Sequence, residues 1–485
     1  MPALARPAEK VCIDLPARRA LLAAETDVLV VGGGPAGIAA AVGAADAGAR
    51  VIVAERYGFL GGNATAALVM PLMSFHTRKS ARGKVGAMTL LPTDHGPGDP
   101  IVAGVLKRLL ERLVRAGGAI PPSLDTGYVV PFDPELFKIA ALDLLDEAGV
   151  QFLFHAFAGD VLRSDAGAPR ANGVVFETKS GPIVVRARAI VDCTGDGDVA
   201  ARAGAPYEIG RFDGLTQPMT LMFRVVDFER TAFEAYVRDH PGEWRGVHGL
   251  WDLVRRASAA GELDLPREDV LFFATPHERE LSVNSTRITR VLGVDVWDLS
   301  YAEWCGRQQM RQIAAFLRKY VPGFERAYVA QSGVNVGVRE TRRILGDYQL
   351  TADDVLGARK FDDAIARGAY PVDIHNPDGK GTVLKHVPLG EAYDIPLRCL
   401  LPRGIDNLIV AGRCISGSHE AHSSYRVMPI VMGTGQAAGV CAALSARAGS
   451  APRSVPVREV QRELVRQGAS LARHHARANR GSKTA

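Results

Sequence analysis

Two histidines and an arginine near the carboxyl-terminal end are the side chains best suited to chemistry in this chain. The segment GSHEAHSSYR (417–426) contains His419, His422 and Arg426. Because imidazole titrates near neutral pH, a histidine here could exchange a proton with a bound molecule. A metal site is the alternative, but zinc peptidases place two histidines four residues apart on a helix. Here the spacing is three, no third ligand is specified, and the flanking glycine and serines do not favour a regular helix. We therefore expect no bound metal.

Other histidines are weaker candidates for proton transfer. His76 follows the apolar stretch MPLMSF, His375 ends a predicted strand, and His386 follows shortly after it. For His76 and His375, a purely structural role remains an equal alternative.

Arginines between residues 334 and 356 are candidates for binding an anion. If this segment is extended, Arg339 and Arg343 share one face of the strand and Arg342 lies on the other. Either these arginines form internal ion pairs, for example Arg342 with neighbours of Glu340, or at least one binds a substrate carboxylate through two nitrogen atoms. The residues expected to be catalytic are His419, His422, Arg339 and His76.

The elements that must position these side chains begin with a glycine-rich unit near the amino terminus. Residues 28–31 form a β-branched run typical of a buried strand, and Gly32, Gly34 and Gly37 follow in G-x-G-x-x-G spacing. Glycines at these positions permit a tight turn and let backbone N–H groups approach a pyrophosphate. A helix (38–47) and a second strand (50–54) follow, and Glu55 is placed to bind a ribose diol. The unit predicts dinucleotide binding, and FAD and NAD share it.

Later segments favour FAD. The loop YGFLGGNATAA (57–67) follows the first unit, a strand ends in TGD (194–196), and another strand (408–411) enters a glycine turn before a small-residue helix (433–446). A nucleotide fold assembled from such distant pieces is typical of two-domain flavoproteins. The expected cofactor-binding residues are Gly32, Gly34, Gly37, Glu55, Arg56, Gly62, Asn63, Ala158, Thr194, Gly195, Asp196, Gly412, Arg413, Arg426, Gly435 and Gln436.

Taken together, these segments resemble the FAD-dependent oxidoreductases related to the succinate dehydrogenase/fumarate reductase flavoprotein group. The resemblance spans residues of about 26 to 447 and also includes VGVRETRRILGDYQLTADDVL and YPVDIHNPDG. It implies bound FAD, and relatives that attach FAD covalently carry a histidine near GGNAT. Asn63 occupies about that position here, so we expect non-covalent FAD.

The expected fold is α/β, with a discontinuous Rossmann-like FAD-binding domain of the GR2 type and an inserted α+β substrate or cap domain. The FAD-binding domain is expected to comprise residues 25–75, 150–206 and 396–450. A helical insertion (76–149), the cap (207–395) and a helical, basic tail (451–485) complete the chain. Within these parts we expect Asp133 to cap a helix, Ser180 and Gly181 to turn a hairpin, and Thr351 with Asp354 to begin a helix.

Composition narrows the functional class. The 485 residues are 47% hydrophobic and 23% charged, and the net charge of +5 is spread along the chain rather than gathered into a nucleic-acid-binding tract. Six dispersed cysteines without CxxC spacing exclude a disulfide reductase and, with no apolar leader, indicate the cytoplasm. The apolar stretch 28–45 contains GGGP, which favours a buried turn over a membrane span. We expect a small-molecule substrate and neither nucleic acid nor membrane as partner. The electron acceptor is not specified, and a homo-oligomer is compatible with the sequence.

The expected function is dehydrogenation of a small polar metabolite at a CH–OH or CH–NH carbon, with hydride transfer to flavin N5. The alternative is an FAD-dependent reductase of an unsaturated carboxylic acid, with Arg339 or Arg426 as proton donor. A non-catalytic or RNA-associated flavoprotein is less favoured, since the chain lacks a concentrated basic patch.

Overall fold

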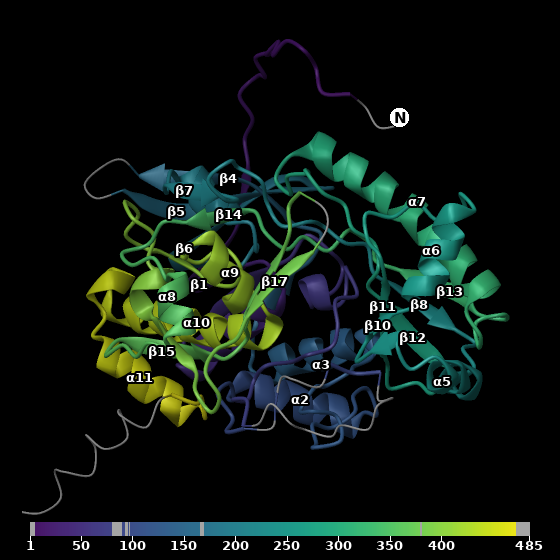
Figure 1. Ribbon diagram of the computed structural model, residues 1–485. Helices are drawn as coiled ribbons and strands as arrows, with labels where there is room; N and C mark the ends of the chain where they lie inside the picture. Colours follow the sequence, from purple (N-terminus) through teal and green to yellow (C-terminus); the bar gives the residue numbers. More distant parts are fainter. Residues whose placement is uncertain are drawn as a thin grey trace, which may run out of the picture.

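The computed structural model describes residues 5–79, 90–92, 96, 98–164, 169–378 and 381–471. It is a mixed α/β structure built around two sheets of different character (Figure 1). The basic part of the expected tail, from residue 472 onward, lies outside the described residues.

A seven-stranded sheet forms the centre of the cofactor domain. Its order is β3 (Gln151–Leu153), β2 (Val51–Ala54), β1 (Leu21–Val31), β6 (Gly181–Asp192), β5 (Arg170–Thr178) and β4 (Phe157–Ser164), with β19 (Leu408–Val410) also paired to β6. Strands β3, β2, β1, β6 and β19 are parallel, whereas β4, β5 and β6 are antiparallel neighbours. The end of β1, from Val28 to Val31, is buried because helices cover the parallel part of the sheet, as its apolar run predicts. This is the Rossmann-like core that we expected.

Three helices pack against this sheet: α1 (Pro35–Asp46), α4 (Asp198–Ala203) and α10 (Met428–Ala448). Helices α2 (Val105–Arg115), α3 (Pro134–Glu147) and α11 (Val457–Arg466) pack in turn on α1 or α10. Helices α1 and α10 approach so closely that a Cβ atom on Gly435 would lie 2.1 Å from the carbonyl oxygen of Ala36. A Cβ atom on Gly439 would lie 1.9 Å from the carbonyl oxygen of Ala40. Glycine at these two positions therefore permits the helix contact.

The second sheet belongs to the cap. Its order is β13 (Tyr328–Ser332), β8 (Phe223–Val226), β12 (Glu280–Val283), β11 (Val270–Ala274), β10 (His248–Gly249) and β9 (Trp244–Arg245). It is antiparallel, and helices α5 (Arg230–Asp239), α6 (Trp251–Ala259) and α7 (Val296–Tyr320) lie with it on the right of Figure 1. An aromatic cluster that includes Phe228, Phe233, Phe272 and Phe324 fills its own separate core.

The segment after the cap sheet packs with the cofactor domain. It contains β14 (Arg342–Ile344), which pairs with β7 (Tyr207–Ile209), then α8 (Ala352–Leu356), β15 (Ala364–Gly368), β16 (Val372–His375), β17 (Thr382–Lys385) and β18 (Tyr393–Pro396). Buried side chains from Ile344 to Ile395 join the core around β1 and α10, whereas Val338 still packs in the cap. The boundary between the core of the cap and the core of the cofactor domain therefore lies between Val338 and Ile344. The boundary expected from the sequence was residue 395. The expected helical insertion, through α2 and α3, also joins the cofactor-domain core.

Three short 3-10 helices complete the described chain: η1 (Gly62–Ala64), η2 (Leu397–Leu400) and η3 (Pro452–Ser454). Local expectations are confirmed at several element ends. Asp133 accepts hydrogen bonds from the N–H groups of residues 135 and 136 at the start of α3. Thr351 and Asp354 form a reciprocal capping box at α8. Gly181 has φ +95° where β5 turns into β6.

In the described part of the chain, one helix, α10, is long and apolar enough to cross a membrane. However, 89% of its apolar window is buried inside the protein.

Candidate functional site: an FAD cavity beside a group of arginines

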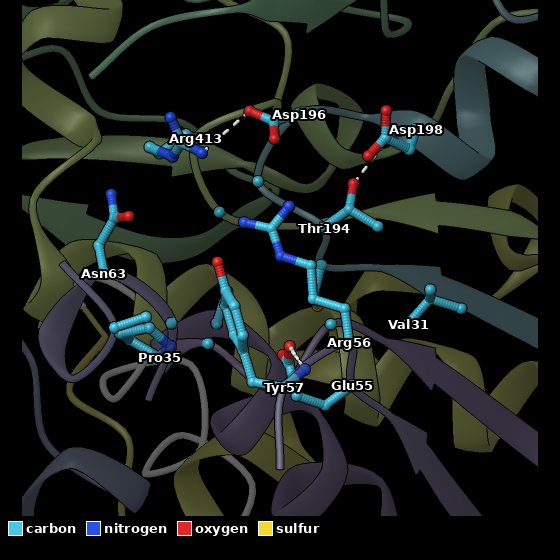
Figure 2. Close-up of a pocket in the computed structure, with 18 of the residues that line it drawn as sticks. Val31, Pro35, Glu55, Arg56, Tyr57, Asn63, Thr194, Asp196, Asp198 and Arg413 are labelled. Atoms are coloured by element: carbon cyan, nitrogen blue, oxygen red, sulfur yellow. Dashed lines mark hydrogen bonds and ion pairs between the residues drawn. The ribbon is translucent and has the colours of Figure 1, made fainter. Parts of the chain in front are cut away.

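A cavity with about 1060 Å³ of empty space, part of it open to solvent, lies at the carboxyl ends of the parallel strands. Strands β1, β2 and β6 end at its wall, and the amino-terminal end of α1 faces it through Pro35 and Ala36. This edge of an open α/β sheet is where nucleotide cofactors bind. Figure 2 shows its walls. Of the expected cofactor-binding residues, all line the cavity except Gly37, Gly435 and Gln436.

The glycines at the base of the cavity bring two loops into contact. Gly32 has φ +100°, and a Cβ atom there would lie 2.5 Å from the carbonyl oxygen of Cys193. A Cβ atom on Gly62 would lie 2.9 Å from the Cα atom of Gly34. The amino-terminal end of α1 has no side-chain cap, so the first N–H groups of the helix are available to an anion such as a pyrophosphate.

Glu55 ends β2 on the same wall. Its two carboxylate oxygens accept hydrogen bonds from the backbone N–H groups of Gly33 at 2.7 Å and Tyr57 at 2.9 Å. These bonds fix the carboxylate against the glycine loop, while burial raises its pKa. Each oxygen retains a lone pair for a further donor, such as a ribose hydroxyl. Tyr57 continues across the cavity, where its hydroxyl donates to Oδ1 of Asn335 at 2.8 Å.

The opposite wall is a polar network that joins the two domains. Asp196 accepts a hydrogen bond from Nη2 of Arg413 at 3.0 Å (Figure 2). It also accepts one from the hydroxyl of Thr341 at 2.8 Å. Arg413 also donates to the carbonyl oxygen of Val338 at 2.6 Å, and Asn63 donates to the same oxygen at 3.2 Å. The residues predicted from four separate sequence segments therefore meet at one site.

Three expected cofactor contacts have packing roles instead. Gly37 lies where a Cβ atom would come within 1.8 Å of the carbonyl oxygen of Gly32, so it lets α1 approach the preceding loop. Gly435 permits the contact between α10 and α1 described above. Gln436 accepts a hydrogen bond from the N–H of Val105 at 3.3 Å and donates to Gln467, so it joins α10 to α2 and to the end of α11.

A group of arginines adjoins the cavity at Arg426. Arg426 lines the cavity, and its Nε atom is buried without a hydrogen-bond partner. Arg339 follows Val338, another residue of the cavity wall. Burial, and then the charges of Arg426 and Arg287, lower the pKa of Arg339 to about 9. Arg339 thus remains charged at neutral pH, as expected for a residue that binds an anion.

His375, at the end of β16, faces the same arginines. Its Nδ1 atom lies 3.5 Å from Nη2 of Arg287, and its Nε2 atom lies 3.6 Å from Oδ2 of Asp373. Burial, followed by the charges of Arg339, Arg426, Arg287 and Arg267, holds the pKa of His375 well below its usual range. The side chain is 23% exposed. With its pKa lowered in this way the imidazole is neutral at neutral pH, and a neutral imidazole can accept a proton.

Contrary to expectation, His419 does not lie on the cavity wall. The segment from His419 to Tyr425 forms a regular helix, α9, because the Ser418 side chain caps it by accepting from the N–H of Ala421. The expectation of an irregular loop is therefore wrong. On this helix, Nδ1 of His419 lies 2.9 Å from Oε1 of Glu340 in a buried network, and its ring is not available to the cavity.

His422 and His76 also lie off the cavity wall. His422 is buried, with Nδ1 3.5 Å from Nε2 of Gln217, and burial together with Arg343 and Arg426 holds its pKa well below its usual range. The ring of His76 contacts the rings of Phe75 and Tyr128, and burial lowers its pKa to about 4. These surroundings favour the structural alternative for both.

The three arginines of residues 339–343 have different partners. Nη1 of Arg343 donates to Oε1 of Glu340 at 2.5 Å, and Arg342 pairs with Asp198 at 2.9 Å. Internal ion pairs, one of the two alternatives, therefore exist, but the partner of Arg342 is Asp198 and not a neighbour of Glu340. Arg339 is the arginine of this segment whose pKa the charges of Arg426 and Arg287 lower.

Sequence reasoning missed Arg287, and left His375 out of the expected catalytic set. Arg287 belongs to the cap, and no local motif marks it. Its pairing with His375 is produced by the tertiary fold alone. The YPVDIHNP segment was the available signal for His375, because it predicts a strand that ends at this histidine.

Fold and site together indicate a flavin-dependent oxidoreductase, an enzyme with a Rossmann-like FAD-binding domain. Residues 27–464 match the model of a family described as FAD dependent oxidoreductase, and the chain belongs to this family. Its cofactor is FAD. The residues present fit that group, since the glycine loops, the uncapped end of α1 and Glu55 form a cradle for a dinucleotide.

No curated protein matches the chain. Among solved structures, a geranylgeranyl bacteriochlorophyll reductase-like protein from Thermoplasma acidophilum is similar, with 12% identity and a TM-score of 0.42 over 93% of this chain and 85% of that chain. A p-nitrophenol 4-monooxygenase from Pseudomonas putida DLL-E4 is similar with 10% identity and a TM-score of 0.44 over 94% and 93%. The family assignment rests on the family match.

Proposed function

We propose that this oxidoreductase dehydrogenates a small polar metabolite at a carbon that carries a hydroxyl or amino group. The observation that supports the proposal best is the placement of His375. It is a histidine of lowered pKa that lies beside the arginines adjoining the FAD cavity at Arg426. Oxidation of CH–OH or CH–NH requires a group that removes the proton from oxygen or nitrogen, and a neutral imidazole does this near neutral pH.

The chain's own residues would divide the work as follows. His375 takes the proton of the O–H or N–H group, and a C=O or C=N bond forms as the C–H bond breaks. FAD, when bound, accepts the hydride that leaves the carbon. Asp373, 3.6 Å from Nε2 of His375, stabilises the imidazolium that forms, and the hydroxyl of Tyr370 donates to Asp373 at 2.7 Å and fixes its position. The neighbouring arginines lower the pKa of His375, so the imidazole is neutral before it accepts the proton.

Reduction of an unsaturated carboxylic acid is a second candidate function, in keeping with the resemblance to the fumarate reductase group. The lowered pKa of Arg339, about 9, favours it, because it makes this guanidinium a stronger acid than an ordinary arginine. In that direction Arg339 would donate the proton to the carbon adjacent to the one that receives hydride.

Anaerobic spectroscopy separates the two candidates. The protein with bound FAD is mixed, without oxygen, with a panel of hydroxy acids, polyols, amino acids and amines, and the flavin absorbance is followed. Bleaching by members of this panel supports dehydrogenation. If no member bleaches the flavin and the chemically reduced protein is instead reoxidised by enoates, the second candidate replaces the first. Failure of both reactions would contradict both functions.

A further inference from the structure

We propose that the amino-terminal arm of this chain, residues 7–17, lies in a groove on the cofactor sheet of a second copy, and that the two copies exchange their arms reciprocally. Two apolar features that the structure leaves uncovered, the arm and the groove, carry this proposal. The exchange is independent of the proposed function.

The groove lies where the cofactor sheet is antiparallel. It has about 960 Å³ of empty space, part of it open to solvent. Strands β4, β5 and β6 and the start of β1 form its floor, and its apolar lining includes Leu162, Val175, Val184 and Leu22. Leu22 is 46% exposed.

The strands under the groove carry apolar residues on both faces of the sheet. Val174 and Val185 belong to the core of the cofactor domain. Their neighbours Val175 and Val184 are paired across β5 and β6 and point to the opposite face, into the groove. An antiparallel sheet that meets solvent on one face normally alternates apolar and polar residues along each strand. Adjacent valines on both strands therefore indicate that the outer face is covered in the assembled protein.

The arm has the pattern of a strand that lacks its sheet. All of its residues are exposed, and Val11, Ile13 and Leu15 are 82%, 83% and 77% exposed. Alternate residues of an extended chain share a face, so these three side chains form one apolar stripe. None of the arm residues forms a hydrogen bond or an ion pair with the rest of the described chain. An exposed apolar stripe of this kind marks a contact surface.

Both ends of the arm are held on their own molecule. Nη2 of Arg6 lies 2.8 Å from Oδ2 of Asp295 at the start of α7, and the Arg6 guanidinium lies over the ring of Trp297. Nη2 of Arg18 lies 2.7 Å from Oε1 of Glu177 near the end of β5. Between these anchors the arm stands away from the body of the protein, as the purple thread at the top of Figure 1 shows. Held in this way, the arm presents its stripe to another molecule.

Charge and size favour a second copy of the chain as that molecule. Glu9 lies on the same face of the extended arm as Val11, and the charged residues that line the groove, Arg18 and Arg186, are both basic. Arg186 is 55% exposed and lies 3.5 Å from Glu25, so its guanidinium can also bind the Glu9 carboxylate of a second copy.

Reciprocal exchange also provides an interface of adequate size. Each copy would contribute its arm and the eight residues of its groove, which approaches the roughly 20–30 residues that each partner of a stable complex contributes. Because both copies use the same two surfaces, the exchange closes into a dimer with two-fold symmetry.

The oligomeric state and two substitutions test the proposal. The full chain with bound FAD is studied by sedimentation equilibrium, and we expect a dimer. Ile13→Asp in the arm and Leu22→Asp in the groove should each raise the dissociation constant of the dimer roughly a hundredfold or more, because each places a charge in an apolar contact. Val465→Asp, at a residue of α11 that is 58% exposed, is the matched control and should leave the dimer unchanged.

Cross-linking identifies the surfaces that meet. One chain carries Ile13→Cys and another carries Val175→Cys, both with Cys12→Ser, because Cys12 is the exposed one of the six cysteines. The two chains are co-expressed with different tags, purified with FAD and treated with a short bismaleimide. We expect a product that contains one chain of each kind. Its yield should fall when Leu22→Asp is added to the chain that carries Val175→Cys.

The proposal is overturned by a monomeric protein, by a dimer that both aspartate substitutions leave intact, or by equal weakening in the control. A chain that carries both cysteines and cross-links only within itself would show that the arm covers its own groove, and would overturn the exchange as well. FAD content and the urea midpoint are measured for every variant, and neither should change, because the arm and the groove do not line the FAD cavity. If Leu22→Asp lowers the urea midpoint, Ile13→Asp decides alone, because Ile13 is 83% exposed.

Discussion

The imidazole of His419 lies 2.9 Å from the carboxylate of Glu340, and both side chains are buried at the junction of α9 with the 339–343 segment. Oε1 of Glu340 also accepts from Arg343 at 2.5 Å, and Oε2 accepts from the N–H of Gln217 at 3.0 Å. The carboxylate of Glu340 thus holds the side chains of Arg343 and His419 and the backbone N–H of Gln217 in place. The network holds together the segments that carry Arg339 and Arg426, although it does not itself reach the FAD cavity.

Glu340→Gln should lower the free energy of unfolding by about 3 kcal/mol, because it leaves the buried Arg343 without its main counter-charge. Urea denaturation followed by tryptophan fluorescence measures the change. Glu262→Gln, which removes an exposed pair with Lys319, is the control and should change stability little. Equal effects of the two substitutions would contradict the structural role of Glu340.

Glu55→Ala should weaken FAD binding roughly tenfold to a hundredfold. The substitution removes the carboxylate offered to the ribose and also the two bonds that hold the glycine loop at Gly33 and Tyr57. The dissociation constant follows from the fluorescence of FAD released on dilution. The exposed Glu147→Ala variant controls for loss of a negative charge. Unchanged retention of FAD in the Glu55 variant would exclude the ribose assignment.

His375→Gln should slow anaerobic reduction of the flavin by substrate on the order of a hundredfold or more, since it removes the proton acceptor. FAD content should not change, because His375 does not line the FAD cavity. His386→Gln, at an exposed position in the next strand connection, should react as the parent does. If His419→Gln lost as much activity as His375→Gln at equal stability, the catalytic assignment would return to the α9 histidines.

The pH profile of flavin reduction should be broad. His375 must be neutral to accept a proton, and its pKa lies well below 6.5, so the rate should persist as the pH falls through 6.5 and decline only in more acidic solution. Arg339 must be charged to bind an anion, so substrate affinity should fall as the pH rises through about 9. The charges of Arg267, Arg287, Arg426 and Asp373, with Tyr370 bonded to Asp373, contribute to both limbs of the profile. A rate constant that drops near pH 6.5 would show an unperturbed histidine in place of His375.

FAD should be released intact when the protein is precipitated with acid. Asn63 occupies the position where covalent relatives carry a histidine, and its amide donates to Val338 instead. Absorbance of the supernatant and of the washed pellet measures the two fractions. Yellow colour that stays with the pellet would demonstrate a covalent bond and refute this expectation.

The cofactor half of the site could be predicted from the sequence because it is encoded by local patterns. Gly32, Gly34 and Glu55 each belong to a short unit in which the residue type is dictated by backbone conformation or by proximity to phosphate and ribose. The starts of helices α3 and α8 could also be predicted, because the capping side chains Asp133 and Thr351 bond to backbone groups within one turn of the chain.

The substrate half could be predicted only in part. Arg339 is one of the residues expected from the sequence, but Arg287, Arg339 and His375 come from three segments whose order along the chain implies no contact. Strand bridges near residues 219, 288 and 337 join the segments of Arg287 and Arg339, and Nδ1 of His375 lies 3.5 Å from Nη2 of Arg287. His419 and His422 misled for a related reason. Their proximity in sequence to cofactor segments indicated proximity in space, but a single turn of α9 directs both rings into protein instead of toward the cavity.

The contact between α1 and α10 also has a consequence for how the chain must be made. Helix α1 begins at Pro35, and the glycine-lined helix that covers it, α10, begins at Met428. The contact between these distant segments cannot form until α10 has been synthesised, so this half of the core forms late. Until then the apolar face of α1 lacks its cover, and FAD has no finished pocket to enter. Flavin loading is therefore a step that follows synthesis of α10, and truncations that remove α10 should yield colourless, aggregating protein.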